Sequence, residues 1–522
     1  LIGLIFCLIA VAFLSKIYSL QIVEGNKYRE ISENNSLNRT VIIAERGVVY
    51  DRRGELIIWN EPDFTGQYSF PVRAYTDRLG MGQLIGYVSY PQKDKKGVYF
   101  RTEYVGRTGV ESAFESYLHG QNGEQIIEED VHGTVVGEHA LKAPIPGGEL
   151  HLSVDAGLSE AMYQIISTSS AQAGFRSGAA AIMDVHTGEI IAMTSFPSYD
   201  PEVMADGDNT DLISSYNTDD RLPFLNKVVS GVYTPGSIVK PFVAYGALAE
   251  DIISPNKEIV STGEIVIPNP YNPDQPSIFR DWRAHGVMTM REAIAFSSNV
   301  YFYIVGGGFG DQKGLGITKL AEYYRKFGMG SITGINLATE QEGVVPDPEW
   351  KQKTFDDDWR LGDTYFTSIG QYGFQVTPLQ MLRAYAALAN GGQLLTPHVM
   401  KGQVSSSTDL GLNPNYLQIV HEGMRKTVIY PGGTARGLER SDVAIAAKSG
   451  TAEIGAGNAY VNSWAAGFWP YEEPRYAFIL MMDKAPRSNA LGASRIMGGV
   501  MEWMAQNRPE YLNPTTTPMI GG

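Results

Sequence analysis

A serine and a lysine three residues apart, Ser237 and Lys240, have the residue types and spacing of a nucleophile and its base. A Pro-Gly pair precedes Ser237 and an apolar run follows Lys240, so the sequence predicts a tight turn that leads into a buried helix. Residues three apart lie on one helical face. A lysine can take the serine proton if burial and nearby cations keep it neutral. A helix cap beside a solvated lysine would give the same pattern, so this pair alone is weak evidence.

A second stretch, Ser297 to Asn299, follows a helical run over residues 288–296. The Ser297 hydroxyl both donates and accepts, which suits a proton relay between the lysines and a leaving amine. The Asn299 amide is suited to bind a substrate amide and to hold Lys240 in place. An asparagine that ends the helix is an equally good interpretation of Asn299 in isolation.

A third stretch, residues 448–451, is Lys-Ser-Gly-Thr and follows a predicted strand over residues 443–447. We expect Lys448 to be a fixed cation that lowers the proton affinity of Lys240 and attracts a substrate carboxylate. Ser449 and Thr451 would offer hydroxyls to that carboxylate. Gly450 would leave room for an extended substrate beside the strand edge. In isolation, a strand that ends in a turn would explain the same residues.

These residues together supply what acyl transfer requires: a nucleophile, a base, a relay and a substrate anchor. The backbone N–H groups of Ser237 and Thr451 are the predicted oxyanion donors. Removal of one such donor typically costs about 10²–10³ in rate.

The predicted elements around these residues indicate an α+β fold with an antiparallel sheet flanked by helices. Two apolar runs around residues 186–188 predict a hairpin. Thr377, Pro378 and Gln380 predict a capped helix that ends near Asn390. Runs at residues 443–447, 464–469 and 476–482 predict three neighbouring strands, and residues 491–506 a terminal helix. Residues 254–287, rich in Pro, Asn and Asp, predict a long functional loop.

Length and composition narrow the class of protein. A chain of 522 residues that is 43% hydrophobic can bury a large core and divide into two to four domains. A net charge of −15 argues against nucleic acid as a partner. Cys7 is the only cysteine, which excludes an intramolecular disulfide and a cysteine metal site. The eight histidines are scattered, so we predict no metal and no cofactor.

Residues 1–23 are mostly apolar, with Lys16 as the one charged residue, and are long enough to cross a bilayer if Lys16 reaches the headgroups. A cleaved signal peptide is the alternative. No Ala-x-Ala site follows the apolar run, so we favour an uncleaved anchor.

Ser-x-x-Lys, Ser-x-Asn and Lys-Ser-Gly-Thr, in this order, resemble the motif set of penicillin-binding proteins and serine β-lactamases. Residues 46–54 and 106–111 also look like the two N-terminal motifs of class B penicillin-binding proteins. Residues 198–201 and 377–380 are similar to motifs of their catalytic domain. The resemblance therefore covers nearly the whole chain. Ser449 where threonine is usual, and a tyrosine in Gly370-Gln371-Tyr372-Gly373, depart from the family pattern.

The resemblance implies four parts: a transmembrane anchor (1–23), an elongated β-rich pedestal (24–150), a transpeptidase domain (151–510) and a C-terminal tail (511–522). It implies that Ser237 attacks the D-Ala-D-Ala end of a peptidoglycan stem peptide, releases D-Ala and forms an acyl-enzyme that a second stem peptide resolves. β-Lactams would acylate the same serine.

The resemblance further implies an anchor in membrane lipid, a catalytic domain on the extracytoplasmic side, and a polytopic glycosyltransferase of the SEDS type as partner. Residues 226–240 look more like the elongation than the division subtype. Three alternatives remain: a membrane β-lactam sensor, a D,D-carboxypeptidase or β-lactamase that uses the same serine, and a non-catalytic scaffold.

Overall fold

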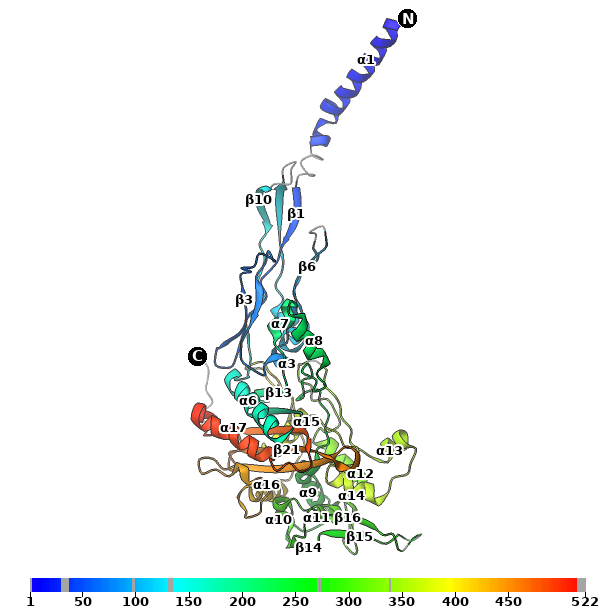
Figure 1. Ribbon diagram of the computed structural model, residues 1–522, viewed down its shortest axis with the longest axis vertical. Coiled ribbons are helices and arrows are strands. Elements are labelled where there is room, and N and C mark those ends of the chain that lie inside the picture. The colour runs from blue at the N-terminus through cyan, green and yellow to red at the C-terminus, as the bar shows by residue number, and fades with distance from the viewer. Residues whose placement is uncertain are drawn as a thin grey trace.

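The computed structural model describes residues 2–29, 37–95, 99–129, 135–269, 272, 274–337 and 339–513. Residue 1 of the predicted anchor and residues 514–522 of the predicted tail lie outside the described residues. A single helix projects from one end of an elongated molecule, a narrow β-rich region follows, and a larger mixed domain forms the other end (Figure 1).

The N-terminal helix consists of α1 (Ile2–Tyr18) and a π-helical turn, η1 (Ser19–Val23). These 22 residues have a mean hydropathy of 2.1, and no other part of the described chain covers them. A helix of this length and composition can cross a membrane. It is therefore a candidate membrane span.

Two main sheets and two further strand pairs, β5–β8 and β6–β7, lie in the described part of the pedestal. One main sheet is antiparallel with the order β1-β9-β10, and the other has the order β11-β2-β3-β4. Strand β11 pairs parallel to β2, so the pedestal sheet includes residues on both sides of the predicted boundary at 150. The strands are β1 (Leu37–Ile42), β2 (Val49–Tyr50), β3 (Leu56–Glu61), β4 (Val72–Tyr75), β9 (Gly123–Glu129), β10 (Val135–Lys142) and β11 (Leu150–His151). Short elements between them are α3 (Gly82–Ile85), β5 (Val88–Ser89), β6 (Gln92–Lys93), β7 (Tyr99–Arg101), β8 (Val105–Gly106), α4 (Gly109–Ala113) and α5 (Glu115–Leu118).

The C-terminal domain is built on a five-stranded antiparallel sheet with the order β13-β12-β22-β21-β20. The strands are β12 (Ser177–Asp184), β13 (Ile190–Phe196), β20 (Ala446–Ile454), β21 (Tyr460–Trp469) and β22 (Tyr476–Pro486). The three predicted C-terminal strands are neighbours and the predicted hairpin is β12–β13, so the predicted fold class is confirmed.

Helices cover both faces of this sheet, because alternate side chains of each strand point to opposite sides. Along β12, Ala180 and Ile182 pack in the core beneath α6 (Ala156–Ala173) and α17 (Ala493–Asn507). Ala179 and Ala181 belong to the other core, with Leu379 of α15 (Pro378–Ala389). The predicted capping box of Thr377 and Gln380 begins α15.

A group of helices adjoins this second core at the end of the molecule farthest from α1 (Figure 1). They are α9 (Lys240–Ala249), α10 (Met290–Phe296), α11 (Asn299–Gly307), α12 (Gly316–Lys326), α14 (Leu361–Ser368) and α16 (Pro414–Ile429). The peripheral elements are α7 (Pro201–Asp206), α8 (Thr210–Thr218), α13 (Pro348–Phe355), β18 (Gln393–Leu395) and β19 (Ser407–Asp409).

The prediction that residues 254–287 form an irregular loop was wrong. They contain two antiparallel pairs, β14–β17 and β15–β16. The strands are β14 (Ile259–Ser261), β15 (Glu264–Ile267), β16 (Ser277–Arg280) and β17 (Gly286–Met288). Each strand is too short for a clear alternation in sequence, but Ile265 and Phe279 are buried and join the β15–β16 pair to the second core.

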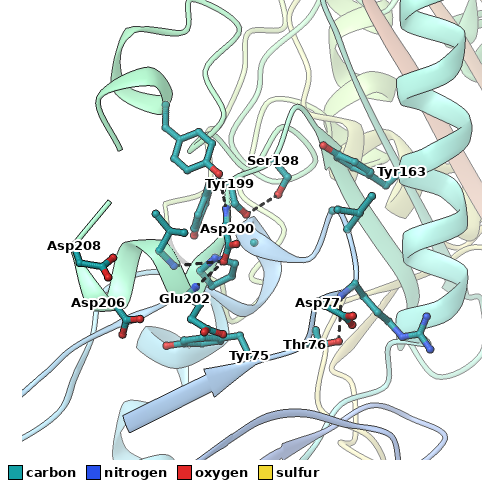
Figure 2. Close-up of a pocket in the computed structure, with 17 residues that line it drawn as sticks. Tyr75, Thr76, Asp77, Tyr163, Ser198, Tyr199, Asp200, Glu202, Asp206 and Asp208 are labelled. Atoms are coloured by element: carbon teal, nitrogen blue, oxygen red, sulfur yellow. Dashed lines mark hydrogen bonds between the residues drawn. The ribbon is translucent and has the colours of Figure 1, made fainter. Parts of the chain in front are cut away.

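The segment Ser198–Pro201, one of the family-like motifs, lies at the joint between pedestal and C-terminal domain (Figure 2). Ser198 Oγ donates to Gln83 Oε1 (2.9 Å), and Asp200 caps α7 by accepting from Glu202 N (2.9 Å). A cavity of about 430 Å³ at this joint has Tyr75 and Asp77 on one side and Tyr163 on the other. None of the predicted site residues lines it, so the motif has a structural role here.

Candidate active site

Ser237 lies in the first turn of a two-part helix. The short 3₁₀ helix η2 (Gly236–Val239) runs directly into α9, and Ser237 is half-buried. Gly236 has a φ of +58° and donates its N–H to Gly370 O (3.0 Å). A side chain at Gly370 would meet Gly236 O at 2.2 Å, so the two glycines allow this close approach. The predicted turn before Ser237 is therefore fixed by the segment that contains Tyr372.

Lys240 is completely buried, on α9, and its amine contacts the second predicted stretch. Lys240 Nζ donates to Ser297 O (2.7 Å), to Ser297 Oγ (3.3 Å) and to Asn299 Oδ1 (2.8 Å). Burial lowers the pKa of Lys240 to about 7, while the charge of Asp281 acts in the opposite direction. A large fraction of Lys240 is therefore neutral near pH 7 and can accept a proton.

Ser297 and Asn299 lie on either side of a sharp connection between two helices. Ser297 ends α10 with a left-handed φ of +57°, and Ser298 caps α11 by accepting from Tyr301 N (3.3 Å). Asn299 is the first residue of α11 and not the end of the preceding helix, so the C-cap interpretation of Asn299 was wrong. The reversal points Ser297 and Asn299 toward the same lysine.

Lys448 lies inside β20, the edge strand of the sheet, and is completely buried. The prediction that the strand ends before this motif was wrong, because β20 continues to Ile454. Lys448 Nζ donates to Ser449 O (2.8 Å). Burial and the charge of Lys240 both hold the pKa of Lys448 well below its usual value. The two ammonium groups are therefore close enough to influence each other.

Strand β20 packs directly against η2, and glycine makes this possible. A side chain at Gly450 would meet Ile238 Cγ2 at 3.0 Å and Pro235 O at 3.1 Å. The space beside Gly450 is thus occupied by the Ser237 turn, and the predicted role of Gly450 toward an extended substrate stays a prediction. Thr451 O would lie 3.1 Å from a side chain at Gly236, and the Thr451 side chain is exposed.

Two side chains at the site were not predicted. Thr434 accepts from Ser449 Oγ (2.6 Å), and Asp281 accepts from Ser298 Oγ (2.7 Å). Asp281 lies within the stretch predicted to be functional from its length, whereas no sequence pattern points to Thr434. Within the residues that the structure describes, no group of three or more His, Cys, Asp and Glu side chains is arranged to hold a metal ion.

Comparison with known proteins identifies the family of this chain. The profile of the penicillin binding protein transpeptidase domain matches residues 178–502, more than half of the chain. The chain belongs to the penicillin-binding protein transpeptidase family. The profile of the penicillin-binding protein dimerisation domain matches residues 67–152, within the pedestal.

Relatives of known function extend the similarity to almost the full length. The peptidoglycan D,D-transpeptidase MrdA of Acinetobacter baumannii is 29% identical, over 99% of this chain and 88% of the relative. A penicillin-binding protein, PBP2, of Helicobacter pylori in complex with MreC is 26% identical with a TM-score of 0.74, covering 90% of this chain and 99% of that one. A chain of a peptidoglycan synthase complex that coordinates polymerization and crosslinking is 25% identical with a TM-score of 0.76, covering 99% of both chains.

The family and these relatives establish the class of reaction. This chain is a serine-type peptidoglycan D,D-transpeptidase, an acyl-transfer enzyme that binds β-lactams. The match to the pedestal as well as the catalytic domain also favours this function over a sensor that would share the catalytic domain alone.

Proposed function

We propose that Ser237 is the nucleophile and Lys240 its base in the cross-linking of peptidoglycan stem peptides. The observation that supports this most strongly is the environment of Lys240. It is fully buried, its pKa is lowered to about 7 by burial, and its amine donates to Ser297 and Asn299. Lys240 also follows Ser237 by three residues, about one helical turn. A lysine in this state can accept the serine proton near neutral pH.

In the first half-reaction, Ser237 Oγ attacks the carbonyl carbon of the penultimate D-Ala, and Lys240 takes the hydroxyl proton. The C–N bond then breaks and terminal D-Ala leaves as an amine, which receives a proton through Ser297. In the second half-reaction, the amine of another stem peptide attacks the ester carbon and loses a proton to Lys240. The C–O bond breaks, and Ser237 regains its proton.

Strand β20 is the proposed binding edge for the stem peptide. As an edge strand it has an unpaired side that can accept an extended peptide. Lys448, Ser449 and Thr451 would bind the terminal carboxylate, and Asn299 a peptide amide. The approach of β20 to η2 supports a shared oxyanion hole made by the N–H groups of Ser237 and Thr451.

A fluorescent penicillin tests the assignment of Ser237. We expect the full-length protein in detergent to be labelled, Ser237→Ala to remain unlabelled, and Ser230→Ala, in the same segment, to be labelled like wild type. Equal labelling of Ser237→Ala would remove Ser237 from its role. A dimeric peptide product from stem-peptide substrates would separate transpeptidation from carboxypeptidase or β-lactamase activity, which would give only hydrolysed products.

We further infer the four-part organisation 1–23, 24–150, 151–510 and 511–522, with the catalytic domain on the extracytoplasmic side. The apolar helix at one end of the elongated molecule supports an anchor (Figure 1). A reporter enzyme that is active only outside the cytoplasm, fused to the C-terminus, should be active. An inactive but stable fusion would contradict this orientation.

The similar chain in a peptidoglycan synthase complex supports a synthase partner, which we propose to be a polytopic glycosyltransferase of the SEDS type. The MrdA and PBP2 relatives support the elongation subtype. Co-purification of the full-length protein with such a glycosyltransferase should depend on residues 1–150. Retention of the partner by a variant that lacks this region would contradict the assignment.

A further inference from the structure

Asp281 lies outside all three predicted motifs, between β16 and β17, yet its side chain is completely buried beside the second motif. Oδ2 accepts from Ser298 Oγ (2.7 Å) and from Val300 N (2.9 Å), and Oδ1 accepts from Trp282 N (2.9 Å). The carboxylate therefore binds the first turn of α11, which is a favourable place for a negative charge.

This first turn is also the part of the chain that contacts Lys240. Ser297 and Asn299, which accept from the lysine amine, are the immediate neighbours of Ser298. Ser297 is held at a φ of +57°, in the left-handed region that is unfavourable for a non-glycine residue. A reversal of this kind persists only where surrounding contacts fix it, and Asp281 provides two of them.

We propose that Asp281 is a positioning residue for the acylation reaction: it fixes the Ser297–Asn299 turn against Lys240 and supplies the negative charge that acts on this buried lysine. This inference rests on the proposed role of Lys240 as the base.

Further contacts hold the carboxylate. The His285 side chain is completely buried, and its Nε2 lies 3.5 Å from Asp281 Oδ1. Arg283 Nε donates to His285 Nδ1 (3.3 Å), which places the imidazole proton on Nε2, toward Asp281. The His285 ring is stacked on Phe296, the last residue of α10. Asp281 is therefore supported from its own loop and from the helix before the turn.

The charges around Lys240 give Asp281 a definite electrostatic effect. Burial favours the neutral form of Lys240, and the charge of Asp281 favours its charged form. The second lysine whose charge interacts with Lys240 is Lys448. Asp281 in turn faces His285 and Lys240, and its charge also acts on the Tyr303 phenol. Burial acts to raise the pKa of Asp281, but the contacts of His285, the N–H groups at the start of α11 and the charge of Lys240 lower it to about 2. Asp281 is thus a fixed anion at neutral pH and not a proton acceptor.

Removal of that anion should make Lys240 easier to deprotonate. The acylation rate of wild type should rise with pH through a midpoint near the Lys240 pKa of about 7, because only the neutral lysine accepts the serine proton. In Asp281→Asn, the midpoint should fall by about one pH unit, as expected for the loss of one nearby opposite charge. The plateau rate should also fall, by about tenfold or more, because the turn is held less firmly.

The test measures the second-order rate of labelling by a fluorescent penicillin between about pH 5 and 9, with full-length protein in detergent. Asp281→Glu keeps the charge and should keep the wild-type midpoint. The matched control is Asp184→Asn. Asp184 is a buried carboxylate that accepts from His186 N (2.9 Å) in the β12–β13 turn, and its variant should have the wild-type midpoint and rate. Ser298→Ala removes one bond to Asp281 but no charge, so it should lower the plateau at an unchanged midpoint.

An unchanged midpoint in folded Asp281→Asn would overturn the proposal, whatever the plateau rate of this variant. The loss of a purely structural residue would lower only the fraction of protein that is active. If Asp281→Asn does not fold, Ser298→Ala decides. Labelling of Ser298→Ala at the wild-type rate would overturn the proposal. Failure of the proposed function is distinguishable, because wild type would then not be labelled at Ser237.

Discussion

Two clusters of buried ionisable side chains, one in the pedestal and one at the active site, differ in how their cationic groups are paired. In the pedestal, Arg46 Nε and Arg73 Nε lie 2.5 Å and 2.7 Å from the two carboxylate oxygens of Glu111, and all three side chains are at most 1% exposed. At the active site, Lys240 and Lys448 are equally buried, but their hydrogen bonds go to neutral oxygens.

Whether a buried cationic group is paired with a carboxylate decides its protonation state. Burial acts to lower the pKa of Arg46, but Glu111 and Glu115 outweigh it and the pKa rises. Burial also lowers the pKa of Lys240, and Asp281 offsets it only in part. The pedestal cluster therefore keeps its charges and joins the two N-terminal family motifs, whereas the catalytic cluster provides a neutral amine. In these two clusters, the paired charges are structural, and the unpaired amine of Lys240 is the proposed base.

The largest expected effect is that of Lys240→Met, which removes the amine and keeps the length of the side chain. We expect labelling by a fluorescent penicillin to fall by about 10³-fold or more, because the serine loses its base. The thermal unfolding temperature should stay the same or rise, because a buried amine is replaced by an apolar group.

Lys227→Met is the matched control for this variant. Lys227 is also buried, at 2% exposure, and burial lowers its pKa to about 8, but its amine donates to Leu222 O (2.8 Å) and not to the catalytic motifs. Its acylation rate should match wild type. A Lys240→Met protein that is labelled normally, or one that unfolds far below wild type, would erase the contrast between the two clusters.

The second expected effect concerns stability. Glu111→Gln leaves Arg46 and Arg73 buried without their shared carboxylate, and removal of one partner of a buried ion pair typically costs about 3–5 kcal/mol. Denaturant unfolding should show this loss, while the acylation rate per folded molecule should stay near wild type.

Glu124→Gln provides the comparison for a surface pair. Glu124 is 43% exposed, 3.5 Å from Arg39, and its substitution should change the unfolding free energy by less than about 1 kcal/mol. Similar losses in both variants would mean that burial of the pedestal cluster contributes little.

The parts of this arrangement that sequence predicted are local. Ser237 and Lys240 share one helical face because helical spacing alone puts residues three apart on the same side. The capping box before α15 and the hairpin β12–β13 likewise depend on neighbouring residues. The three motifs could be assigned to one site only through the resemblance to a known family, since no local rule brings residues 237, 297 and 448 together.

The parts that sequence did not predict depend on contacts between distant segments. Asp281 lies in a region whose strands have three or four residues each, too few to show a period. Thr434 is significant only because its loop lies against β20. The close contact of Gly450 with the Ser237 turn was not predicted, because the sequence does not reveal which backbone approaches this glycine.

The smallest expected effect tests a neutral hydrogen bond at the edge of the catalytic cluster. Ser449→Ala removes the 2.6 Å bond to Thr434 without changing any charge. One neutral hydrogen bond contributes about 0.5–1.5 kcal/mol, so acylation should fall by about tenfold or less. The measurement is the same labelling rate, compared with that of Lys240→Met.

Ser449→Thr is the control that separates the hydroxyl from the shape of the residue. It keeps a hydroxyl at the position where the family usually has threonine, so its labelling rate should lie within a few-fold of wild type. A loss in Ser449→Ala as large as that in Lys240→Met would show that the reaction depends on hydroxyl contacts along β20 as much as on the buried amine. The unpaired amine of Lys240 would then no longer be the feature that distinguishes this cluster from the one in the pedestal.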